Sequence, residues 1–310
     1  MQLDLFCDNR RTIRLNDAGE LLRALRLEEA LAVFGELLAE APEDTELLAL
    51  QGLVAAWRER LSRFHAAPAG SERLHDLWRE LTPQTPSPLA AALRALLVDE
   101  LRQLPSPELI YIPPRFHIGT LLLAAGRFAE AEHWCARALG AGIGERGRFL
   151  GWRGDALTRL NDPDRAKEAY LAAFLEGPHE VDLESLQSPL IHDLLGSLES
   201  EEHDFGETDL LAWLPVWGWL RGAFGLPLQT LMADRAVYVD ALEAAHTSRS
   251  LPMPRPWFED MRYAEYLRTT FRDDRELVRV RRRMRQLNGF MFEQYLEKIR
   301  GPEGGPAVRT

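Results

Sequence analysis

Cysteines, long apolar runs and signal-peptide features are scarce or missing in this chain of 310 residues. The two cysteines, Cys7 and Cys135, are too few for a disulfide framework. The most apolar window, 210–228, is interrupted by two prolines and an arginine, whereas a membrane span needs about 20 largely uninterrupted apolar residues. Charged residues interrupt the first dozen positions, unlike the apolar core of a signal peptide. We therefore expect a cytoplasmic protein that does not enter a membrane.

Motifs that indicate catalysis or cofactor binding are also missing. The sequence has no Walker loop, no GxSxG nucleophile elbow and no zinc-type spacing of Cys and His. The spacing of the dinucleotide-binding motif GxGxxG is present at Gly142, Gly144 and Gly147. That motif functions only after a β-strand, and the residues before Gly142 have a helical pattern instead. Histidine lies beside carboxylates near His192 and His203, but without the spacing of a metal site. We expect no metal, no cofactor and no catalytic residue.

An internal repeat with an offset of 35 residues is the main feature that the sequence does contain. Gly119, Leu122, Ala131, Cys135 and Ala138 correspond to Gly154, Leu157, Ala166, Tyr170 and Ala173. Small residues at fixed positions allow two antiparallel helices to approach closely, and the larger residue fills the gap that remains. A period near 34 with this pattern is typical of stacked helical hairpins, because a single hairpin leaves an apolar face exposed.

Turn signals fall where such a repeat needs them. Gly126 precedes the second helix of one unit, and Asp162 and Pro163 begin the second helix of the next. Pro178 ends that unit. A further copy of the repeat lies near the N-terminus, where six residues occupy the same repeat positions: Ala18, Leu21, Ala30, Phe34, Leu37 and Pro42.

These residues resemble the tetratricopeptide repeat (TPR) family over roughly 14–178. The family's consensus Trp and Tyr in the first helix are missing, and Pro83, Pro86 and Pro88 interrupt the middle of the match. Ala, Leu, Arg and Glu dominate the composition, which favours helices. We predict an all-α fold: an α-α superhelix of stacked helical hairpins over 1–180, and an additional C-terminal helical region over 181–310 that packs on the array or caps it.

The resemblance implies a protein-binding or peptide-binding scaffold that uses the concave face of the array, and we expect no enzymatic activity. By position in the repeat, the candidate peptide-binding residues are Phe116, Thr120, Leu123, Arg148, Asp155 and Arg159. The family's clamp for C-terminal carboxylates uses Lys and Asn at such positions. This chain has neither Lys nor Asn at the corresponding positions, so we do not expect that clamp.

Two alternatives from other classes stay open. The chain could be a structural subunit of a larger complex, forming a homo-oligomer through aromatic residues around Trp217 or Trp257. It could also be an enzyme with a site between the array and the C-terminal region, near 199–209. Large apolar residues at helical spacing usually form a core, and we predict core positions for Trp213, Trp217, Trp219, Phe224, Trp257, Phe258, Tyr263, Tyr266 and Phe271.

Charge is unevenly distributed along the chain, whose net charge is −11. Residues 176–209 contain eleven acidic residues and no Lys or Arg, whereas fourteen basic and nine acidic residues follow from Arg249 onward. Five arginines lie between Arg279 and Arg285, on a segment whose apolar residues recur at helical spacing. The acidic segment and the arginines could pair with each other or with a partner, or could simply face solvent. A nucleic-acid partner is not expected, because the pI is near 5.3.

Overall fold

A computed structural model describes residues 3–201, 205, 210–226 and 254–301. The described residues form fourteen α-helices and no β-strand, which confirms the all-α prediction. Contacts divide the chain into two compact units, Met1–Ala141 and Gly142–Thr310. The predicted boundary at 180 therefore falls inside the second unit. The physical reason is that the helix ending at Glu176 packs against the helix that begins at Leu210.

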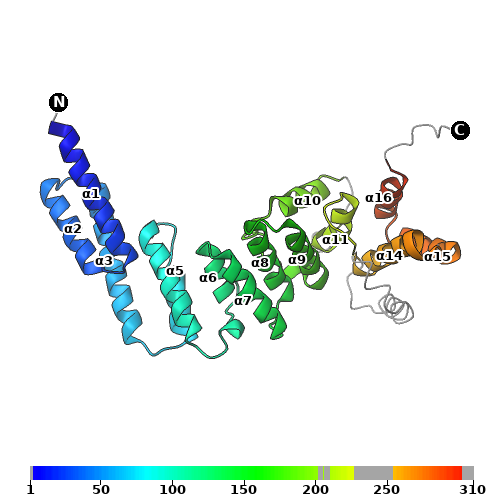
Figure 1. Cartoon of the computed structure of the whole chain (residues 1–310), viewed down its shortest axis with the longest axis horizontal. Coiled ribbons are helices and arrows are strands. Elements are labelled where there is room, and N and C mark those ends of the chain that lie inside the picture. The colour runs from blue at the N-terminus through cyan, green and yellow to red at the C-terminus, as the bar shows by residue number, and fades with distance from the viewer. Residues whose placement is uncertain (1–2, 202–204, 206–209, 227–253, 302–310) are drawn as a thin grey trace. The chain divides into compact units, whose positions relative to one another are not determined.

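The first unit consists of seven α-helices, and the longest connection between them runs over 103–117, from α5 to α6 (Figure 1). They are α1 (Leu3–Arg23), α2 (Leu27–Glu40), α3 (Thr45–Ala66), α4 (Ser71–Arg79), α5 (Ser87–Arg102), α6 (Ile118–Ala124) and α7 (Phe128–Gly140), with a 3₁₀ turn η1 (Pro107–Leu109) before α6. Consecutive helices pack in pairs, α1 on α2 and α6 on α7. The predicted N-terminal copy supplies core residues here: Ala18, Ala30, Phe34 and Leu37 are all buried.

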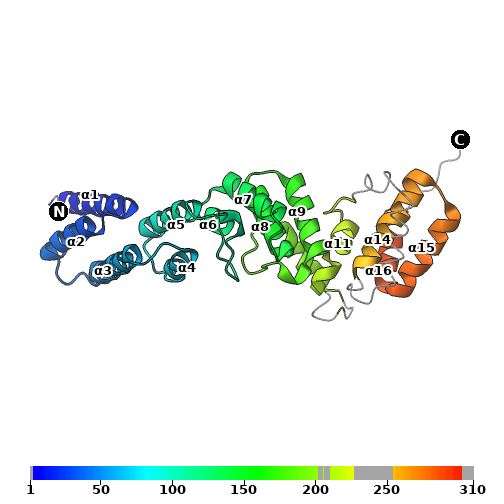
Figure 2. The ribbon, with the colours of Figure 1, turned by 90° about the horizontal axis from the view of Figure 1, so that it is seen from below.

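The second unit contains seven described α-helices. They are α8 (Arg146–Arg159), α9 (Pro163–Glu176), α10 (Pro189–Glu199), α11 (Leu210–Leu220), α14 (Pro254–Tyr266), α15 (Asp274–Leu287) and α16 (Gly289–Arg300), with a 3₁₀ turn η2 (Pro178–Glu180) and a π-helical turn η3 (Leu267–Phe271). The helices α14 and α15 lie side by side in both ribbon views (Figure 1 and Figure 2).

Polar caps explain why several of these helices begin where they do. The carboxylates of Asp44, Asp162 and Asp273 each accept a hydrogen bond from the backbone N–H three residues later. Asn288 does the same for Met291. Such caps satisfy backbone donors that the first turn of a helix leaves unpaired. The predicted starts of the second helices agree with the structure, because α7 begins at Phe128 and α9 at Pro163.

The repeated glycines lie where two helices of a hairpin come closest. A Cβ atom on Gly119 would lie 2.7 Å from Cys135 Sγ, within the α6–α7 hairpin. A Cβ atom on Gly154 would lie 2.5 Å from Tyr170 Cε1, within the α8–α9 hairpin. Ala131 and Ala166 are buried at the expected positions. The predicted arrangement, a glycine opposite a larger residue, is therefore confirmed within each hairpin.

Aromatic residues fill the core of the second unit, as predicted. Trp217 and Trp257 are fully buried, and their indole N–H groups donate to Ser197 Oγ at 2.7 Å and to the Met284 carbonyl at 3.0 Å. Both rings are therefore unavailable as anchors of an oligomer interface in this conformation. Two residues depart from the predicted core: 48% of Phe271 is exposed, and Trp219 is only half-buried.

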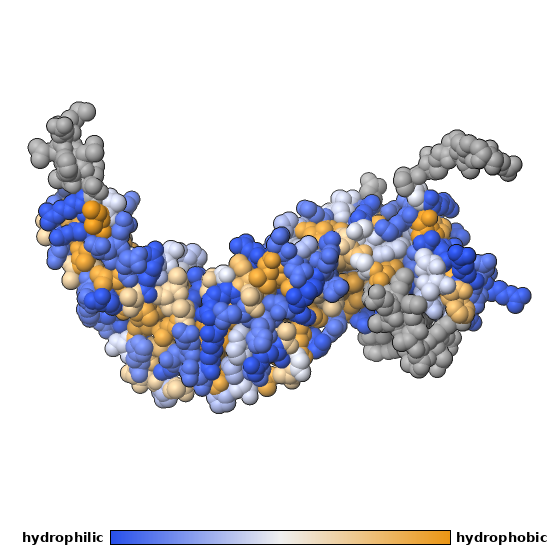
Figure 3. Space-filling model, in the orientation of Figure 1, coloured by the Kyte–Doolittle hydropathy of each residue, from blue (hydrophilic) through white to orange (hydrophobic). Residues whose placement is uncertain are grey.

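Apolar and hydrophilic residues are interspersed on the face seen in Figure 3. None of the described helices combines the length and apolar character that a membrane span requires. The apolar helix α11 contains Pro215 and packs against α9, α10 and α14.

Candidate functional site

The structure places Phe116 in the core of the first unit rather than on a binding surface. Its side chain is fully buried, with ring centroids 5.2 Å from His75 and 5.7 Å from Trp78. Phe116 also precedes α6, which begins at Ile118 after its cap His117, because the Phe116 backbone exchanges two hydrogen bonds with Ile112 instead of joining the helix. Its predicted role in peptide binding is therefore not compatible with this conformation.

Thr120 and Leu123 lie on α6, as predicted, but Thr120 has a structural role. Its hydroxyl donates to the Arg115 carbonyl at 2.5 Å and accepts from the His117 backbone N–H at 3.3 Å. The His117 ring completes a reciprocal cap by accepting from the Gly119 N–H at 3.0 Å. Leu123 is half-buried. Thr120 thus fixes the start of α6.

Asp155, on α8, is buried and already hydrogen-bonded. Its Oδ1 accepts from the Tyr170 hydroxyl at 2.7 Å and from the Gln187 backbone N–H at 3.0 Å. Burial raises the pKa of the Asp155 carboxyl to about 6, although both hydrogen bonds oppose that change. A partner could not reach this carboxyl without displacing residues of the chain itself.

The segment 177–188 covers the face of α8 on which Asp155 lies. The Gly147 N–H donates to Glu180 Oε2 at 2.8 Å, and a Cβ atom on Gly147 would collide with the backbone of Gly177. Val181 is buried against Gly151, and Gln187 bonds Asp155. We call residues 177–188 the strap.

Arg148 and Arg159 lie at the two ends of α8. Arg148 is half-buried and forms an ion pair with Glu145 at 2.6 Å, while Arg159 is exposed in the last turn. Three of the six candidate residues belong to the first unit and three to the second. That all six residues belong to one binding surface stays a prediction.

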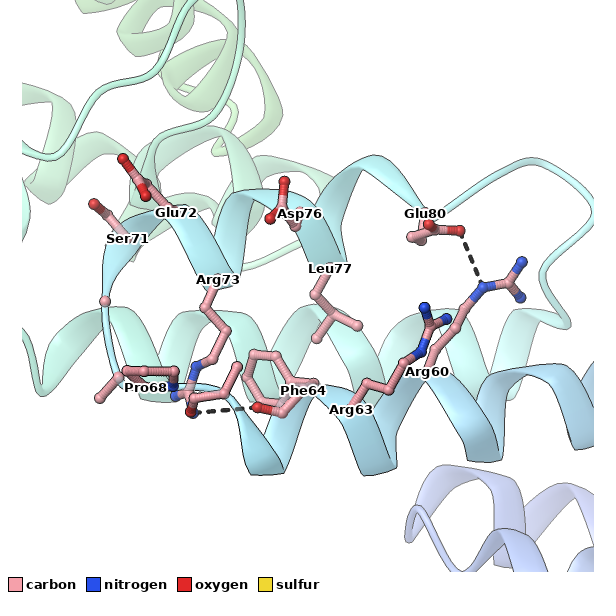
Figure 4. Close-up of a pocket in the computed structure, with 13 residues that line it drawn as sticks. Arg60, Arg63, Phe64, Pro68, Ser71, Glu72, Arg73, Asp76, Leu77 and Glu80 are labelled. Atoms are coloured by element: carbon pink, nitrogen blue, oxygen red, sulfur yellow. Dashed lines mark hydrogen bonds and ion pairs between the residues drawn. The ribbon is translucent and has the colours of Figure 1, made fainter.

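An open groove between α3 and α4, within the first unit, is a candidate site (Figure 4). Its volume is about 640 Å³, which falls in the range of about 300–1,000 Å³ found for ligand sites. Leu77 points from α4 toward Phe64 on α3, and both are almost fully buried (Figure 4). The turn between the helices adds Ala67, Pro68 and Ala69. These residues form an apolar floor.

Two arginines of the groove are held in place by other residues. The Arg73 guanidinium lies 4.3 Å from the centre of the Phe64 ring, donates to the Ala67 carbonyl at 3.2 Å and pairs with Glu100 at 2.6 Å. Arg60 pairs with Glu80 at 3.0 Å, joining α3 to the end of α4. These contacts tie the two helices together and fix the width of the groove.

Other charges at the groove have no ion-pair partner among the described residues. Arg63 rises from α3, while Glu72 and Asp76 lie on α4, and all three are exposed (Figure 4). The groove therefore has a free guanidinium on one side and two free carboxylates on the other. Such an arrangement can hold a ligand that carries both charges.

Sequence reasoning did not identify this groove. Arg60, Arg63 and Phe64 have the i, i+3, i+4 spacing of one helix face, but that spacing occurs on many helices. The groove is lined by α3, the turn at 67–70 and α4, and residue spacing along one helix does not give the angle between two helices.

No three His, Cys, Asp or Glu side chains in the described part of the chain lie close enough to hold a metal ion. Residues 202–204 and 206–209, which belong to the alternative catalytic site, lie outside the described residues. Neither a protein-family model nor a curated protein nor a solved structure matches this chain.

Proposed function

We propose that this protein is a scaffold or adaptor that binds a peptide segment of a partner protein in the α3–α4 groove. The observation that carries the proposal is the groove of about 640 Å³, whose apolar floor lies between opposite charges that have no ion-pair partner in the described part of the chain. Binding sites combine apolar area with a few polar groups that fix the orientation of the ligand. The groove offers both.

The charges indicate which peptide fits. An apolar side chain would lie over Phe64 and Leu77, an acidic side chain would pair with Arg63, and a basic side chain would pair with Asp76. Arginine binds carboxylates through two parallel hydrogen bonds, so the acidic residue fixes the direction of the peptide. The expected motif therefore has an apolar residue between residues of opposite charge.

We also propose that the helical hairpins stack as a TPR-like superhelix. The repeat offset of 35 residues and the glycine opposite a larger residue in two successive hairpins support this proposal. Phe116 and Asp155 would have structural roles in such an array, because both are buried.

Selection from a random library tests the groove. The full chain would be panned against phage-displayed random dodecapeptides, and enriched peptides would be measured by fluorescence polarisation. We expect enriched peptides to combine an apolar residue with both charges. Ala69→Trp, which places an indole in the groove at an exposed turn position, should abolish their binding.

Charge reversal shows whether the contacts are the proposed ones. Arg63→Glu should weaken binding about tenfold, because an attraction becomes a repulsion, and a peptide whose acidic residue is changed to lysine should regain affinity for that variant. Arg79→Glu is the matched control, since Arg79 is an exposed arginine of α4 that does not line the groove. Equal binding to wild type, Ala69→Trp and Arg63→Glu would overturn the proposal, as would the enrichment of no peptide.

A further inference from the structure

We infer that the exposed face of α15 is a docking surface for an acidic helix of a partner protein. The opposite face of α15 faces the core, where Leu277, Val280 and Met284 are buried as the apolar periodicity predicts. Asp274 and Gln286, near the two ends of α15, are also exposed, and between them lies a set of four arginines and one valine: Arg275, Val278, Arg279, Arg282 and Arg285. We call this set the arginine face.

Two arginines of the same helix lie outside this face and are used within the fold. Arg283 donates from Nε to Asp260 Oδ2 at 2.8 Å, and Arg281 donates to the Tyr295 hydroxyl at 3.3 Å. Asp260 is fully buried, so the Arg283 pair holds α15 against α14. The arginines of α15 therefore fall into two groups: some bond residues of the fold, and the others face solvent.

The charge of the arginine face is largely uncompensated. Arg275, Arg282 and Arg285 have no ion pair or hydrogen-bond partner among the described residues, while Arg279 pairs with Glu276 at 2.8 Å. The partners of Arg279 and Arg283 both come from the C-terminal helices rather than from the acidic segment 176–209. Solvent-facing guanidiniums of one sign on one helix face attract carboxylates.

An exposed apolar residue lies at the middle of this face. Val278 is 57% exposed, and no other large apolar side chain in the described part of the chain exceeds that value. On a helix, Arg275 and Arg282 are its neighbours at i−3 and i+4. A partner can therefore bury Val278 while the arginines pair around it, which is the arrangement of an apolar centre within a polar rim.

Spacing and charge favour an acidic helix over a nucleic acid as the occupant. Arg275 and Arg282 are seven residues apart, or about 10.5 Å along the helix, which matches carboxylates two turns apart on a facing helix. A nucleic acid would extend beyond the face toward a chain of net charge −11 and pI near 5.3. The carboxylates on the facing side of a helix lie within about one Debye length of the arginines, where the local charge dominates.

A synthetic helix tests this surface on the full chain. The probe is a labelled three-heptad peptide with glutamates at i, i+4 and i+7 and a leucine between them. We expect saturable binding that weakens with salt. The triple variant Arg275→Glu/Arg282→Glu/Arg285→Glu should weaken binding about tenfold, since three exposed pairs each change affinity by roughly twofold or more. Val278→Ser should weaken it about threefold, because an apolar contact is lost.

Matched controls separate the proposed geometry from simple attraction between opposite charges. Arg300→Glu changes another exposed arginine of the second unit and should leave binding unchanged. A peptide of identical composition with glutamates spread around the helix should bind several-fold more weakly. Equal binding of the two peptides, no effect of the triple variant, or tighter binding of a DNA duplex or of anionic phosphatidylserine vesicles would overturn the inference. The α3–α4 groove belongs to the other unit, so Arg63→Glu should not affect this binding.

Discussion

Gly154 and Tyr170 face each other across the α8–α9 hairpin at a distance that excludes any side chain on residue 154. Tyr170 cannot easily move away, because its hydroxyl bonds Asp155 at 2.7 Å and lies 3.2 Å from Thr158 Oγ1. The pair therefore sets how closely the two helices approach. Gly119 and Cys135 have the same relationship in the α6–α7 hairpin.

Replacing Gly154 with alanine should destabilise the protein. The new Cβ atom would lie 2.5 Å from Tyr170 Cε1, and overpacking of this kind costs about 1–3 kcal/mol. The gain in helix propensity, about 1 kcal/mol, offsets only part of that cost. Urea unfolding followed by circular dichroism measures the change.

Gly196→Ala is the matched control. Gly196 is an exposed glycine within α10, and nothing lies within 4 Å of a Cβ atom placed there. This substitution should stabilise the protein by up to about 1 kcal/mol. Equal effects of the two glycine substitutions would contradict the proposed contact.

Ionisation of Asp155 should destabilise the second unit as the pH rises. The folded-state pKa of about 6 lies above the ordinary value of 3.8, so the folded protein binds more protons between pH 4 and 6. The free energy of unfolding should therefore fall by about 3 kcal/mol at most through that window. Asp155→Asn keeps the acceptor for Tyr170 and Gln187 but should remove this pH dependence. An unchanged profile in the variant would refute the assignment.

His117 should have the opposite effect in the first unit. A neutral ring with its proton on Nε2 donates to the Glu108 carbonyl at 3.1 Å and accepts from the Gly119 N–H. Burial lowers the pKa of the ring to about 4, from 6.5. The unfolded chain binds more protons between these values, so acidification through this window should lower the free energy of unfolding. NMR titration of the imidazole protons should show a midpoint near 4, and a midpoint above 6 would contradict the burial.

Removing Arg283 should be far more damaging than removing its neighbour Arg282. Arg283→Ala leaves the buried Asp260 carboxylate without its guanidinium partner, and breaking a buried pair costs about 3–5 kcal/mol. Arg282→Ala should change stability by less than about 0.5 kcal/mol, as is usual for an exposed position. Thermal unfolding compares the two variants, and similar melting temperatures would argue against the pair.

Local features of the fold could be predicted from the sequence because they depend on neighbouring residues. The offset of 35 residues identified Gly119 and Gly154 as close-contact positions, and Asp162–Pro163 marked the start of a helix. The core positions of Trp217 and Trp257 followed from helical spacing. These features need only the geometry of one helix or one hairpin.

Features that depend on distant segments could not be predicted in the same way. Asp155 has the spacing of a surface residue on α8, but the strap returns from beyond α9 and covers it. Phe116 lies outside its predicted helix, because its backbone pairs with Ile112 and α6 starts only at Ile118, after its cap His117. The α3–α4 groove likewise depends on the angle at a turn, which residue spacing does not encode.

The strap also limits how the loop after α9 can vary between related sequences. Its contacts at Glu180, Val181 and Gln187 occupy fixed points along α8, so the chain length between them is set by the helix beneath. An inserted or deleted residue between 180 and 187 would leave at least one anchor out of register. Length changes should instead be tolerated at exposed turn positions such as 141–142, where the side chains are not packed against a helix in this way.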